Sequence, residues 1–186
     1  MENIPCYRCY SKNYILELKD YPIIEEHLKD DFYEIGNIGC GDYEVILPIV
    51  YFKDAYRKFV CHCGLLVDDN GPFVAVSEFG YNNYIKDVNL KMVFAMLLHE
   101  LGHYKNGDFE TCSATEYAKI RNEAVSKGIV TNQELNADRF AAEEIGKAAV
   151  INMLNRLIAV RKRRNDIGVN GAINEFQLRI KAVSRL

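Results

Sequence analysis

Apolar residues change their spacing along the chain near residue 86. Before that point, short apolar runs alternate with polar residues, Gly and Pro, as is typical of strands and turns. After it, long segments repeat their apolar residues at helical spacing. We therefore predict an α+β fold in a single domain over residues 1–186, with a sheet-rich part at 1–86 and a helical part at 87–186.

Three apolar segments in the first part predict strands of a small, mostly antiparallel sheet, at 42–52, 59–67 and 72–79. The last two segments flank DDNG, residues 68–71, and Asn-Gly between apolar runs is a strong hairpin signal. A short helix is predicted over 22–31, because it opens with Pro, which is favoured at the first helical position.

Residues that cap helices mark the ends of the helices predicted in the second part. The first helix has Asp87 as a candidate N-cap and Gly107 as a candidate left-handed residue after its end. The second stops at Gly128, and the third opens at Thr131 or at the residue after it. The predicted helices cover 88–106, 113–127, 132–145, 148–164 and 173–186.

Charge and composition exclude some classes of partner. The net charge of −3 is spread over the chain, and no basic face is visible, so we expect no nucleic acid as main partner. The one basic run, RKRR at 161–164, is typical of a solvated last turn of a helix. We see no secretory signal and no run of about 20 apolar residues, which predicts a cytoplasmic protein without a membrane span.

The six cysteines allow two interpretations. CYRC (Cys6 and Cys9) and CHC (Cys61 and Cys63) could form a second, structural zinc site, although CHC lacks the usual C-x₂-C spacing. Reduced free thiols are the favoured interpretation, because a cytoplasmic chain keeps its cysteines reduced.

The sequence HELGH, residues 99–103, lies in the first helix of the second part. Residues four apart share a helix face, so His99 and His103 can both direct a ring nitrogen to one ion. Glu100 lies about 100° round the helix, where it can reach a water on the metal but is poorly placed as a ligand. This spacing is typical of a zinc hydrolase in which Glu100 is the general base.

A catalytic zinc site requires a third protein ligand. No histidine follows His103 in the sequence. Asn106 and Phe109 stand where the extended H-E-x-x-H-x-x-G-x-x-H motif requires Gly and His, so that class is excluded. The third ligand is therefore expected to be a carboxylate on a later helix.

The segment ELNAD, which opens the third predicted helix, is the best source of that carboxylate. Glu134 is expected to bind the metal, and Asp138 to accept a hydrogen bond from the far nitrogen of a ligand histidine, which fixes the tautomer. If Glu134 is not the ligand, the alternatives are Glu110, Glu116 and Glu123.

Two motifs of the helical part together resemble a known group of enzymes. HELGHYKNGD at 99–108, followed by ELNADRFAAEEIG at 134–146, resembles the gluzincin clan of zinc metallopeptidases. The chain is most similar to the soluble core of the HtpX and CAAX-prenyl-protease type, and in second place to ImmA/IrrE-type peptidases. The resemblance covers about 88–186, without the transmembrane helices of the membrane-embedded members.

The resemblance implies a set of roles for this chain. His99, His103 and Glu134 would bind Zn²⁺, Glu100 would be the catalytic base, and Asp138 would support a ligand histidine. It also implies an edge strand over the HExxH helix that binds an extended substrate through its backbone, and residues 72–79 are the candidate.

The expected function is a zinc-dependent endopeptidase that acts on a peptide or protein substrate. Tyr117 and Arg139 are candidates for stabilising the oxyanion. The alternative is a latent or inactive gluzincin that serves as a regulatory or immunity-type protein-binding module. The intact Glu100 favours the enzyme, because a binding module needs no general base.

Overall fold

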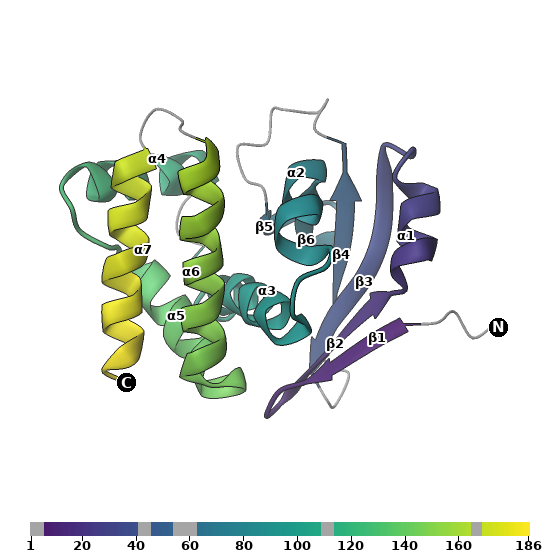
Figure 1. The fold of residues 1–186 in the computed structure, drawn as a ribbon, viewed down its shortest axis with the longest axis horizontal. Helices are drawn as coiled ribbons and strands as arrows, with labels where there is room; N and C mark the ends of the chain where they lie inside the picture. Colours follow the sequence, from purple (N-terminus) through teal and green to yellow (C-terminus); the bar gives the residue numbers. More distant parts are fainter. Residues whose placement is uncertain (1–5, 41–45, 54–62, 109–113, 165–168) are drawn as a thin grey trace. The chain divides into compact units, whose positions relative to one another are not determined.

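The computed structural model describes residues 6–40, 46–53, 63–108, 114–164 and 169–186. The chain forms two compact units, Met1–Leu90 and Lys91–Leu186, whose boundary lies close to the change in apolar spacing. The fold is α+β: the first unit carries a sheet, and the second is helical (Figure 1). No helix in the described part of the chain is long and apolar enough to cross a membrane.

The first unit contains a six-stranded mixed sheet in the order β1-β2-β3-β4-β6-β5. Neighbouring strands are antiparallel except for β4 and β6, which are parallel. The strands are β1 (Cys6–Tyr10), β2 (Tyr14–Lys19), β3 (Phe32–Cys40), β4 (Ile46–Phe52), β5 (Cys63–Asp68) and β6 (Gly71–Ser77).

The sequence analysis assigned no strand to the segments that form β1, β2 and β3. Glycines inside β3 explain part of this difference, because Gly is depleted in strands. At Gly36 the structure requires it, since a Cβ there would lie 2.1 Å from the backbone oxygen of Glu17 in β2. Close pairing of two strands, rather than local preference, therefore selects the residue.

The predicted hairpin between β5 and β6 is confirmed. Asp68 pairs with Gly71, and Asp69 and Asn70 form the turn between them. The Asp68 carboxylate accepts a 2.8 Å hydrogen bond from the backbone N–H of Asn70, and Gly71 adopts a φ of 116°, which favours glycine.

The prediction that residues 72–79 form an edge strand is wrong. β6 lies between β4 and β5, so both of its edges are paired, and β5 forms the edge of the sheet. Residues 74–77 are all buried, as is typical of an interior strand that is covered on both faces. From Glu78 the chain continues as the short helix α2 (Glu78–Gly80) and a π-helical turn, Tyr81–Ile85.

The core of the first unit is apolar. The largest side chains that are fully buried there are Leu16, Leu18, Ile24, Ile35, Ile38, Leu47, Ile49, Tyr51, Tyr81 and Ile85. The helix α1 (Tyr21–His27) begins with Pro in its first turn, as predicted, but ends before residue 31.

In its described residues, the second unit contains five helices, close to the five that were predicted. They are α3 (Leu90–Lys105), α4 (Ala114–Ser126), α5 (Asn132–Ile145), α6 (Lys147–Arg164) and α7 (Val169–Ser184). Figure 1 shows α6 and α7 packed side by side.

Most of the predicted helix ends are confirmed. Gly107 and Gly128 have φ values of 67° and 69°, and the Thr131 hydroxyl accepts a hydrogen bond from the backbone N–H of Glu134. Asp87 is not the cap of α3, because the helix begins only at Leu90 and Asp87 itself has a φ of 56°.

Candidate metal centre

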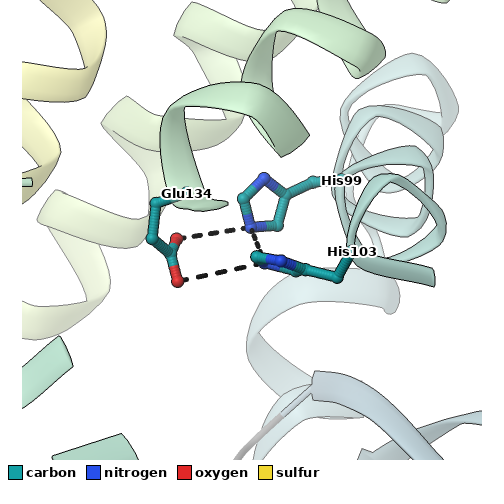
Figure 2. A group of neighbouring side chains, drawn as sticks. All are labelled: His99, His103 and Glu134. Carbon is teal, nitrogen blue, oxygen red and sulfur yellow. Dashed lines mark hydrogen bonds and ion pairs between the residues drawn. The ribbon is translucent and has the colours of Figure 1, made fainter. Parts of the chain in front are cut away.

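Two helices bring the site together. His99 and His103 lie one turn apart on α3 and face Glu134, which lies in the first turn of α5 (Figure 2). Gly102 allows the close approach of the two helices, because a Cβ at this position would lie 2.9 Å from the Cα of Ala137. The missing side chain therefore lets the imidazoles reach the carboxylate.

The distances between the three side chains fit a single metal ion. The two Nε2 atoms of His99 and His103 are 3.2 Å apart. They lie 3.4 Å and 3.9 Å from the two carboxylate oxygens of Glu134. Ligands held about 2.0–2.1 Å from a tetrahedral ion lie roughly 3.3–3.4 Å from one another, so this spacing suits a divalent metal.

The three residues are almost completely buried, with exposed fractions of 6% for His99, 3% for His103 and 2% for Glu134. Two imidazoles and a carboxylate form a donor set that suits zinc and other first-row divalent metals. The group could therefore hold a metal ion.

Each histidine is also contacted by a second carboxylate at its other ring nitrogen. Asp138 Oδ1 lies 2.9 Å from His99 Nδ1, as expected for a residue one turn after Glu134. Asp108 Oδ2 lies 2.8 Å from His103 Nδ1. These partners leave the Nε2 atoms directed at the candidate metal position.

The sequence analysis did not identify Asp108, although a local signal was present. Gly107 takes up a left-handed conformation directly after α3, and the Asp108 N–H then bonds to the His103 carbonyl at 3.1 Å. The turn at Gly107, which ends the helix, therefore places the Asp108 carboxylate beside the His103 ring.

The carboxylates favour a proton on one of the two histidines. Burial and the charge of Arg179 oppose protonation of His99, but the charge and hydrogen bond of Asp138, together with Glu134, raise the pKa of His99 to about 9. Burial, and next the charge of His99, lower the pKa of His103. A metal ion therefore has to displace a proton from His99.

Two arginines that the sequence analysis did not single out complete the site. The Arg179 guanidinium donates two hydrogen bonds of 2.7 Å to the carboxylate of Asp138 and one of 2.5 Å to Glu134. Arg121 binds both oxygens of Glu175 and lies 3.3 Å from Glu134. Burial opposes ionisation of Glu134, but Arg179 and then Arg121 lower its pKa well below the usual range.

The residues proposed for oxyanion stabilisation lie in different environments. Tyr117 is buried, and its hydroxyl donates a 2.8 Å hydrogen bond to Glu134. Arg139 is exposed on α5. Glu100 is half-buried beside His99.

Two of the three alternative third ligands are not part of this group. Glu116 and Glu123 lie on exposed positions of α4, and Glu123 pairs with Lys127. Glu110 lies outside the described residues.

Among the described residues, no cysteine belongs to a group that could hold a metal ion. Cys9 lies in β1 and Cys63 in β5, which form opposite edges of the six-stranded sheet. Cys9 and Cys63 are half-buried, and Cys61 lies outside the described residues.

Comparisons with protein-family models, with curated proteins and with solved structures give no match to this chain.

Proposed function

We propose that the chain is a zinc-dependent endopeptidase of the gluzincin type. The observation that carries the proposal is the buried set of His99, His103 and Glu134, with Glu100 next to it on the same helix. Two imidazoles and one carboxylate are the ligand set of catalytic zinc in hydrolases, which leaves a fourth position for water or substrate.

His99, His103 and Glu134 would hold the zinc ion, which would supply a bound water of lowered pKa and a Lewis acid for the scissile carbonyl. Glu100 accepts the proton from the attacking water and passes it to the leaving amine. Asp138 and Asp108 hold the two imidazoles in the orientation that directs each Nε2 to the site.

Zinc content is the first test. Protein purified without added metal and then analysed for elements should carry about one zinc per chain. A value near zero, without uptake on titration, would refute the zinc centre. A value near two would require a second site elsewhere in the chain.

Glu100→Gln tests the catalytic role. The variant keeps the size of the side chain but removes the base, so it should retain zinc and lose peptidase activity by several orders of magnitude. Digests of a peptide library and of a denatured protein measure the activity. Glu143→Gln, a change at an exposed position of α5, is the matched control and should cleave like the wild type.

Two results would overturn the proposal. Equal activity in wild type and Glu100→Gln would mean that another group, or a contaminant, performs the cleavage. No activity in either protein, also after limited proteolysis, would favour the regulatory binding module.

A further inference from the structure

Arg179 is one of the most deeply buried charged residues in the described part of the chain. It lies on α7, and only 2% of its surface is exposed. Besides its bonds to Asp138 and Glu134, its Nη2 lies 3.3 Å from both ring nitrogens of His99. One guanidinium thus contacts a candidate metal ligand on α3, another on α5, and the carboxylate that orients the first.

The charges around Arg179 explain why an arginine is buried at this position. Arg179 and Arg121 face the carboxylates of Glu134, Asp138 and Glu175, which are all buried. A buried carboxylate without a partner is strongly destabilising, and breaking a buried pair by removing one member is far more costly than replacing both. Without Arg179, Asp138 would lose both of its guanidinium hydrogen bonds and Glu134 its shortest one.

The position of Arg179 relative to the candidate metal is informative. Its Nη1 donates to Glu134 Oε2, and the same oxygen is the one that lies 3.4 Å from His99 Nε2. A cation bound by the histidines would therefore contact an oxygen atom that already accepts a bond from a guanidinium. The bound cation and the Arg179 guanidinium would therefore share the negative charge of the Glu134 carboxylate.

We propose that Arg179 is a built-in counter-ion that takes the place of the metal while the site is metal-free. It balances Glu134 and Asp138, and so keeps α3, α5 and α7 joined before a metal enters. The inference rests on the proposed function only in assuming that the site binds a divalent metal. Its consequence is that the helical unit folds without metal, unlike small metal domains that unfold when the metal is removed.

The test is thermal unfolding, followed by the helical circular dichroism signal, of the full chain with excess chelator and with saturating zinc. The chelated wild type should unfold cooperatively. Chelated Arg179→Met should melt roughly 6–20 °C lower, because two buried carboxylates lose their partner. Zinc should restore more than half of this loss, because it supplies positive charge to Glu134, and should raise the wild type by less.

Arg185→Met is the matched control, since Arg185 is exposed just after α7. It should melt like the wild type in both conditions. If Arg179→Met does not fold, the proposal is tested instead with the triple variant Arg179→Met, Glu134→Gln, Asp138→Asn. It removes Arg179 together with the two carboxylates that accept its hydrogen bonds, so it should regain a cooperative transition in chelator.

The proposal would be overturned if the wild type unfolds in chelator, or if Arg179→Met is as stable as the wild type. It would also be overturned if Arg179→Met loses the same amount of thermal stability with and without zinc, or if the triple variant is no more stable than Arg179→Met. Zinc titration of the wild type by calorimetry separates this inference from the proposed function. If no zinc binds, the zinc centre fails, while the chelated proteins still report whether Arg179 balances the carboxylates.

Discussion

The two units of the chain differ in what they bury. In the described part of Met1–Leu90, the core is apolar and Ser77 is the one polar residue that is largely inaccessible. In the described part of Lys91–Leu186, the buried polar residues are His99, His103, Asp108, Glu134, Asp138, Glu175 and Arg179. Because buried charges are costly unless they are paired, this difference places the candidate functional site in the second unit.

One pair of contacts makes the comparison sharper. His27 Nδ1 lies 2.9 Å from Asp30 in the first unit, and His103 Nδ1 lies 2.8 Å from Asp108 in the second. The side chains of the first pair are 41% and 42% exposed, and those of the second are 4% and 9% exposed. The geometry is the same, but only the second pair is shielded from water, so only there can the carboxylate fix the orientation of the imidazole strongly.

The largest effect is expected from losing a metal ligand. Glu134→Ala should reduce zinc affinity by more than about 100-fold, because it removes one of the three protein ligands. Competition with a chromophoric chelator measures the affinity. Glu143→Ala, an exposed change on the same helix, should bind like the wild type. Unchanged affinity in Glu134→Ala would show that the ligand set is wrong.

The two His–Asp pairs provide the next test. Asp108→Asn should weaken zinc binding by roughly 10–100-fold, because the amide no longer holds His103 in the required tautomer as strongly. Asp30→Asn removes the matching carboxylate at the exposed pair and should leave zinc affinity unchanged. Equal effects of the two substitutions would mean that burial does not distinguish the pairs.

A smaller effect is expected from closing the gap between α3 and α5. In Gly102→Ala the new Cβ would lie 2.9 Å from the Cα of Ala137, so the helices must separate. We expect a loss of about 1–3 kcal/mol in the free energy of unfolding, together with weaker zinc binding.

Gly171→Ala is the matched control for Gly102→Ala. Its Cβ would lie 3.1 Å from a methyl group of Val125, which can move, and the helix gains from the change to Ala. This variant should be neutral or more stable in a urea titration. A Gly102→Ala protein with the same behaviour would show that the close approach is not needed.

The pH dependence of the metal-free protein is the last test. Because the folded pKa of His99, about 9, lies above the unfolded value of about 6.5, the stability that its proton contributes is complete below pH 6.5. It is lost as the pH rises through 9, by up to about 1.4 kcal/mol per pH unit. Urea titrations of the chelated protein at several pH values measure this slope. His99→Asn should remove it, whereas His27→Asn at the exposed pair should retain it.

Local features of the chain could be predicted from the sequence alone. The hairpin at 68–71, the stops at Gly107 and Gly128, and the cap at Thr131 follow from the conformations these residues favour within a few positions of themselves. The pairing of His99 with His103 follows from the helical period alone. Such features need no packing partner, so the sequence predicts them.

Other features depended on packing between distant segments. The place of ELNAD at the start of a predicted helix favoured Glu134 over Glu116 and Glu123 as the third ligand, but its contact with the histidines follows from the approach of α3 and α5 at Gly102. The interior position of β6 likewise depends on a parallel partner, β4, whose pairing has no local signal.

The contacts of Arg179 are the extreme case. They join it to Asp138 and to His99, which are 41 and 80 residues away in the chain. From the sequence, an arginine in the last third of an amphipathic helix is expected to be solvent-exposed, because arginine is almost never fully buried unless it is paired. Its partners become visible only when α7 packs against the carboxylates of α5, since charge compensation acts between neighbours in space and not along the chain.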